Sequence, residues 1–201
     1  MNLAMRPLLD HLTQLEQKFK SLAPHHAFVF GISCAERQWP IYELASEGKV
    51  WSNQQILRQI LDKTWDWLLG EGEFPHGCSE MCEKAILESI EDENASFAYH
   101  VTVSLSAYFY NIENNLPTEC FRIGGENLEL IETLVYDLYK LPISSQNDPI
   151  IDRHPLMMEE MSLQKGELAV LLAQKIPLGK IVNGFRDHSK SRSIFQNYWH
   201  S

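Results

Sequence analysis

The residues best suited to hold a charged site lie at 34–42, C-A-E-R-Q-W-P-I-Y, directly after the apolar run A-F-V-F-G-I-S. On a helical wheel Arg37 falls on the same side as Phe30 and Ile41, so its guanidinium faces an apolar surface. An unpaired buried charge costs several kcal/mol. Arg37 is therefore predicted to be buried and paired, either with Glu36 or with another acid.

Pro40 lies within the same stretch and affects its expected shape. A proline inside a helix removes a backbone donor and clashes with the carbonyl four residues earlier, here that of Glu36. Because Trp39 is a poor N-cap for a new helix, one kinked helix over residues 26–46 is predicted instead of two helices. The kink and its polar cluster are either a packing device or the opening of a ligand pocket.

A second set of polar side chains comes from residues 96–112, S-F-A-Y-H-V-T-V-S-L-S-A-Y-F-Y-N-I. Val101, Val103 and Leu105 alternate with polar residues as they would in a strand. No second alternating run exists to pair with them, so a central helix with a stripe of hydroxyl groups is predicted. The candidate ligand-binding residues are Glu36, Arg37, Tyr42, His100 and Thr102.

The sequence contains few of the motifs that bind metals or form catalytic nucleophiles. A di-iron bundle needs Glu-x-x-His on two helices, which the chain does not supply. His76, Cys78 and Cys82 lie close together, but a zinc site needs a fourth ligand, so the two cysteines are predicted to be buried thiols. There is no Gly-x-Ser-x-Gly and no Cys-x-x-Cys. No metal, no cofactor and no catalytic residue is expected.

Composition limits the partners and the compartment. The net charge of −10 argues against nucleic-acid binding, which depends on neutralising phosphates. No run has the length and uncharged character of a membrane span, and the N-terminus lacks the pattern of a signal peptide. With four cysteines and no such signal, reduced thiols in the cytoplasm are expected.

The charge is also segregated. Residues 71–94 hold eight acids and one base, whereas residues 175–201 hold five bases and one acid. The acidic segment is either a solvated face or a docking surface for a protein partner. A homodimer is expected, with apolar contacts through residues such as Met157, Met158 and Trp199.

Helical periodicity runs through the whole chain and predicts an all-α bundle of seven or eight helices in one domain, 1–201. The expected helices are 8–22, 26–46, 53–70, 79–90, 96–112, 126–141, 155–174 and 178–188. The segment 114–127 is expected to be a linker, and 190–201 a tail that is loosely ordered.

The pattern Glu-Arg-x-aromatic-Pro-x-Tyr at 36–42, followed by R-Q-I-L-D-K-T-W-D-W-L at 58–68, resembles the YjaG-like family of uncharacterised bacterial proteins. The resemblance extends to about residue 195. It implies an all-α protein in the cytoplasm of a bacterium, and it brings no established activity or cofactor.

Two functions follow from these observations. The first is a cytoplasmic protein-interaction or binding protein without catalysis. The alternative is a helical ligand-binding protein or enzyme with a pocket near Arg37, Tyr42 and Thr102. A closed core around Arg37 would favour the first.

Overall fold

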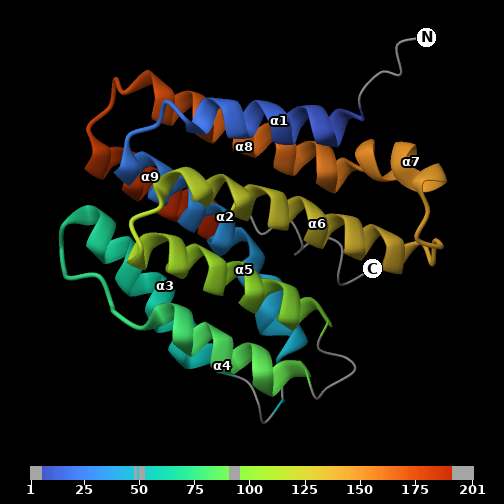
Figure 1. The fold of residues 1–201 in the computed structure, drawn as a ribbon, viewed down its shortest axis with the longest axis horizontal. Helices are drawn as coiled ribbons and strands as arrows, with labels where there is room; N and C mark the ends of the chain where they lie inside the picture. Colours follow the sequence, from blue (N-terminus) through green and yellow to red (C-terminus); the bar gives the residue numbers. More distant parts are fainter. Residues whose placement is uncertain (1–5, 48, 50–52, 91–95, 192–201) are drawn as a thin grey trace.

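The structure is a computed structural model that describes residues 6–47, 49, 53–90 and 96–191, the side chains of 86–90 excepted. Within these residues the chain forms nine α-helices and two short 3-10 helices (η1, η2) and no strand (Figure 1). In chain order they are α1 (Pro7–Phe19), α2 (Pro24–Ala45), α3 (Gln54–Leu69), α4 (Cys78–Ile90), α5 (Ser96–Glu113), η1 (Pro117–Cys120), α6 (Phe121–Leu138), η2 (Ser145–Asn147), α7 (Asp148–Asp152), α8 (Pro155–Ala173) and α9 (Leu178–Ser191).

The predicted all-α class is confirmed, and residues 96–113 form a helix and not a strand. The described residues hold one helix more than expected because the five-residue α7 lies in a segment read as a helix break. Proline stands in the first turn of α1, α2 and α8, where its missing N–H would have no helical partner in any case. Gly70 ends α3 in the left-handed conformation, with φ of 78°.

Several predicted helix boundaries are wrong. α1 ends at Phe19 and not at residue 22, and α6 ends at Leu138 and not at residue 141. α6 begins at Phe121, inside the expected linker, because the glycine pair at 124–125 lies within the helix and does not end a loop. A Cβ on Gly124 would lie 3.0 Å from both Gln164 Oε1 and Leu15 Cδ2, so this glycine serves close helix packing. α9 extends to Ser191, so 190–191 belong to a helix, and the rest of the expected tail lies outside the described residues.

α2 is the central helix. It packs against α3, α5, α6, α8 and α9, and most of its residues are buried. It continues through Pro40 as a single helix, which confirms that the stretch is not two helices. The predicted kink itself stays a prediction.

α2 packs tightly against α5 at Gly31. A Cβ at this position would lie 2.5 Å from a ring carbon of Tyr108. The ring is fully buried, and its hydroxyl donates to the carbonyl of Phe28 at 2.9 Å, which holds it in place. Glycine is therefore required here by sterics.

Gly31→Ala should lower the free energy of unfolding by about 1–3 kcal/mol, because the added carbon must displace a buried ring. Urea unfolding followed by circular dichroism measures the change. Gly179→Ala is the matched control, since a Cβ on that helical glycine meets nothing within 4 Å. Equal stability of the wild type and Gly31→Ala would show that the ring moves without cost.

Candidate functional site

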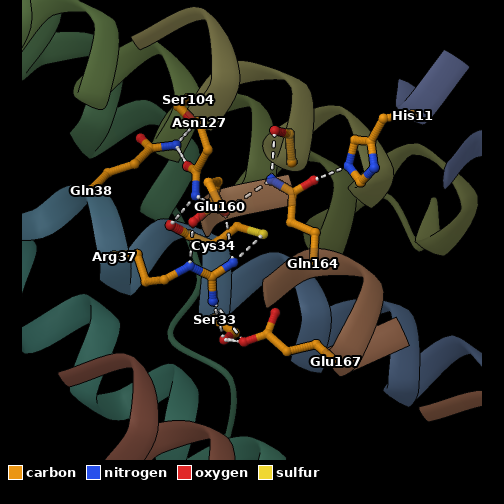
Figure 2. A network of polar contacts seen from close by, with 11 residues as sticks. His11, Ser33, Cys34, Arg37, Gln38, Ser104, Asn127, Glu160, Gln164 and Glu167 are labelled. Carbon is orange, nitrogen blue, oxygen red and sulfur yellow. Dashed lines mark hydrogen bonds and ion pairs between the residues drawn. The ribbon is translucent and has the colours of Figure 1, made fainter. Parts of the chain in front are cut away.

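Arg37 is completely buried on the side of α2 that faces α8 (Figure 2). Its Nε and Nη2 donate to the two oxygens of Glu160 at 3.0 and 2.9 Å, and its Nη1 donates to Glu167 Oε1 at 2.6 Å. Nη1 also donates to Ser33 Oγ at 2.9 Å, and Nη2 to Cys34 Sγ at 3.3 Å. A guanidinium has five N–H groups, and these contacts use all five. The side chain therefore has no donor left for a ligand in this arrangement.

Glu160 is the acceptor on which the network converges. Besides the two donors from Arg37, its Oε1 accepts from Asn127 Nδ2 at 2.9 Å and from Gln164 Nε2 at 2.8 Å. Asn127 lies on α6 and Gln164 on α8, one turn beyond Glu160. Four N–H groups thus stabilise one buried carboxylate.

The periphery of the network reaches two more helices. Gln38 Nε2 donates to Asn127 Oδ1 and, at 3.0 Å, to Ser104 Oγ on α5. His11 Nε2 on α1 lies 2.9 Å from Gln164 Oε1. The polar network therefore joins α1, α2, α5, α6 and α8 in the interior of the bundle.

The two glutamates differ in how their charge is stabilised. Burial alone would raise the pKa of Glu160, but the charge of Arg37 and the hydrogen bonds from Arg37, Asn127 and Gln164 outweigh it, and the pKa is lowered. Burial raises the pKa of Glu167, and Arg37 and Ser33 offset this only in part while the charge of Glu160 adds to it. Arg37 therefore stabilises the negative charge of Glu160 more than that of Glu167.

Glu36 is the other charged residue of the motif and faces away from this network, toward α3. It is 3% exposed, and its two oxygens accept from Arg58 Nη1 and Nη2 at 2.6 and 2.8 Å. Its Oε2 also accepts from Trp65 Nε1 at 3.0 Å. The Arg58 guanidinium lies over the ring of Trp39, 5.3 Å from its centroid. Glu36 thus links α2 to α3, as Arg37 links α2 to α8.

The burial and pairing predicted for Arg37 are confirmed, with Glu160 and Glu167 as the acids and not Glu36. Tyr42 is buried beside Trp39, and its hydroxyl accepts from the backbone N–H of Asn53 at 3.3 Å.

The two candidates on α5 lie apart from these contacts. Thr102 is buried, and its hydroxyl donates to the carbonyl of Ala98 in its own helix at 2.9 Å. His100 is half-buried, with its ring 5.9 Å from that of Tyr99. Arg37 thus contacts α8, Tyr42 contacts Asn53 just before α3, and Thr102 bonds within α5. Their predicted role in ligand binding stays a prediction.

The two cysteines of the cluster formed by His76, Cys78 and Cys82 are protonated thiols. Cys78 and Cys82 are buried in α4, and the Cys78 thiol donates to the carbonyl of Pro75 at 2.7 Å. Burial raises the pKa of Cys78 to about 12 and that of Cys82 further, so both are thiols at neutral pH. The one Glu-x-x-His spacing, Glu73 to His76, lies in the loop before α4. Among the described residues no three His, Cys, Asp or Glu side chains form a group able to hold a metal ion.

A pocket of about 390 Å³ lies between α8 and α9, and sequence reasoning did not find it. Its lining is mostly apolar and includes Glu167, so the pocket borders the network around Arg37. The helix-interior glycines Gly166 and Gly184 also line it, and a Cβ on either would meet nothing within 4 Å. The remaining lining residues are Ser162, Leu163, Val170, Ile176, Lys180, Ile181, Phe185 and His188.

A wider hollow of about 600 Å³ lies between the start of α5 and the end of α6. Its lining begins at Ser96, next to residues outside the described part of the chain. In the described ranges, no helix combines the length and apolar character needed to cross a membrane.

The chain is thus an all-helical protein organised around a buried arginine–glutamate network. It belongs to the family described as "Protein of unknown function (DUF416)", whose model matches residues 14–195.

The fold is shared with the crystal structure of a DUF416 family protein from Shewanella baltica. The TM-score is 0.71 at 16% sequence identity, and the match covers 88% of this chain and 93% of that one. The chain is also 23% identical, over 210 residues, to the ATP-dependent protease ATPase subunit HslU1 of Trypanosoma brucei brucei. That alignment covers 94% of this chain but only 42% of the relative, so the chain spans about two fifths of its length.

Proposed function

We propose that the chain is a binding protein without catalysis and that its ligand site is the pocket between α8 and α9. The volume of about 390 Å³ and the apolar lining with a few polar groups are typical of small-molecule sites. In this proposal Glu36 and Arg37 do not contact the ligand, because their hydrogen-bonding groups are used within the fold. Arg37 fixes the position of Glu167, which lines the pocket.

The observation that carries this proposal is the pair of glycines, Gly166 and Gly184. Glycine inside a helix costs roughly 1 kcal/mol relative to alanine. Close packing explains this cost at Gly31, but at Gly166 and Gly184 no neighbouring atom lies where a Cβ would go. Both line the same pocket from facing helices. A ligand that needs the space between these helices accounts for both glycines.

Gly184→Leu should weaken binding in the pocket and leave the fold intact. The leucine fills open space, and helix propensity should raise the free energy of unfolding by about 0.5–1 kcal/mol. The probe is 2-phenylethanol, titrated into ¹⁵N-labelled protein and followed by NMR shifts of the α8 and α9 amides. We expect saturable binding to the wild type and a Kd raised by about tenfold or more in the variant.

Gly179→Leu is the control, because it adds the same side chain to α9 at an open position outside the pocket lining. It should bind the probe as the wild type does. The proposal fails if the wild type shows no saturable shifts, or if Gly184→Leu and Gly179→Leu bind equally well.

For the cellular setting, we propose the cytoplasm of a bacterium. The four cysteines are free and buried, which supports a reducing compartment. The structural neighbour from Shewanella baltica supports a bacterial source.

We also propose a homodimer, with contacts that differ from those predicted from the sequence. Met157 is fully buried and unable to take part, which corrects the sequence-based choice, whereas Met158 is 56% exposed. Trp199 lies outside the described residues. At the basic end, Arg186 pairs with Asp66 and Lys190 with Asp62 of the same chain, which leaves less charge for a head-to-tail contact with acidic residues 71–94.

A further inference from the structure

We propose that the ligand of the α8–α9 pocket is a small primary amine, with an apolar body between the helices and its ammonium group bound by Glu167. This inference rests on the binding function proposed above and specifies its ligand class. It starts from a buried polar atom of the lining residue Glu167 that has no hydrogen-bond partner among the described residues.

That atom is Glu167 Oε2. The other oxygen of the same carboxyl group, Oε1, accepts from the Ser33 hydroxyl and from Arg37 Nη1, both at 2.6 Å. Oε2 is buried and has no hydrogen-bond partner among the described residues. Figure 2 shows it turned away from Ser33 and Arg37. A buried acceptor without a donor is costly, so a ligand that brings a donor gains free energy here.

The charges of the cluster favour a cation over an anion. Glu160 and Glu167 share one guanidinium, which binds Glu160 through two hydrogen bonds and Glu167 through one. All five donors of Arg37 are used, so a ligand carboxylate or phosphate would find no free guanidinium N–H. An ammonium group would instead offset the second carboxylate. The net charge of −10 also favours the approach of cations from solution.

The pocket walls suit an apolar body of moderate size. Leu163 on α8 and Ile181 and Phe185 on α9 supply aliphatic and aromatic surface. Lys180 and His188 also line the pocket. Lys180 is exposed, and its flexible stem lets the ammonium group turn toward solvent when a cation binds. An anionic ligand would depend on Lys180, which gives the two ligand classes opposite responses to its removal.

The test compares three probes with one apolar body at pH 7 and fixed ionic strength: 2-phenylethylamine, 2-phenylethanol and 3-phenylpropanoate. Kd values come from the same NMR titration. The amine should bind about tenfold more tightly than the alcohol, as expected for a hydrogen bond to a charged group, and the carboxylate most weakly.

Three variants separate the explanations. Glu167→Gln should reduce the preference for the amine over the alcohol to less than about twofold, because the charge is gone while the shape is kept. Lys180→Gln should tighten amine binding, because it removes a positive charge from the pocket lining. Gly184→Leu should weaken all three probes.

Tightest binding of 3-phenylpropanoate, lost in Lys180→Gln, would overturn the amine assignment in favour of an anion. Equal binding of all three probes, weakened by Gly184→Leu, would also overturn it while the proposed binding function stands. If no probe binds the wild type, both proposals fail together.

Discussion

Glu160→Gln should lower the free energy of unfolding by about 3–5 kcal/mol at pH 7, whereas Glu167→Gln should change it by less than about 1 kcal/mol. Both glutamates lie on α8 and contact the same arginine. Four N–H groups converge on the Glu160 carboxylate, so the amide NH₂ of a glutamine would face at least one of them. Glu167 Oε2 has no donor opposite it, so an NH₂ group is accommodated there.

The pH dependence of the two variants should differ in sign. The lowered pKa of Glu160 contributes stability that is present above the unfolded-state pKa and lost as pH falls through the folded-state pKa. The raised pKa of Glu167 acts oppositely, and its contribution is lost as pH rises through the folded-state pKa. Relative to the wild type, Glu167→Gln should therefore gain stability as pH rises above the ordinary glutamate range.

Urea unfolding of the wild type and both variants at a series of pH values from about 4.5 to 8 measures these differences. Arg37→Lys is measured as a third variant, because a lysine ammonium group has three N–H donors and cannot replace the five N–H donors of the guanidinium. Equal losses for Glu160→Gln and Glu167→Gln at every pH would contradict the assignment of Arg37 mainly to Glu160.

Glu36→Ala should cost about 3–5 kcal/mol of unfolding free energy, while Asp62→Ala should cost less than about 1 kcal/mol. Both carboxylates accept hydrogen bonds from Arg58, so the arginine is the same in each comparison. Glu36 is 3% exposed and Asp62 39% exposed, and water replaces a lost partner only at the second site. Glu36→Ala also leaves the buried N–H of Trp65 without its acceptor.

Thermal and urea unfolding of the two variants, with Arg58→Ala measured alongside, test this difference. Arg58→Ala should resemble Glu36→Ala, since it leaves a buried carboxylate unpaired. A loss for Asp62→Ala as large as that for Glu36→Ala would mean that the surface pair, and not the buried one, holds α3 against α2.

Most of the fold could be predicted from the sequence, because helical periodicity and proline positions are local signals. The burial of Arg37 was predictable for the same reason, since a charge on an apolar helix face must be paired. Its partners were not, because any of 27 acidic residues could supply them and 123 residues separate Arg37 from Glu160. Gly124 misled the assignment of α6, because glycine in a sequence marks a loop and a close helix contact equally well.

The pocket was beyond sequence reasoning for a different reason. It is the space between two helices, and periodicity gives each helix a buried face without fixing the gap between neighbours. The only signal was glycine in the middle of two helical segments, at 166 and 184, where alanine would form a better helix.

The central position of α2 has a consequence during synthesis. Fifteen of its 22 residues are buried in the finished protein, and its charged partners on α8 lie more than a hundred residues further along the chain. At translation rates of about 5–20 residues per second, this helix waits on the order of ten seconds for α8 to be made. During that interval its apolar faces and its arginine lack their native neighbours, so the growing chain is expected to need protection by chaperones until α8 and α9 have left the ribosome.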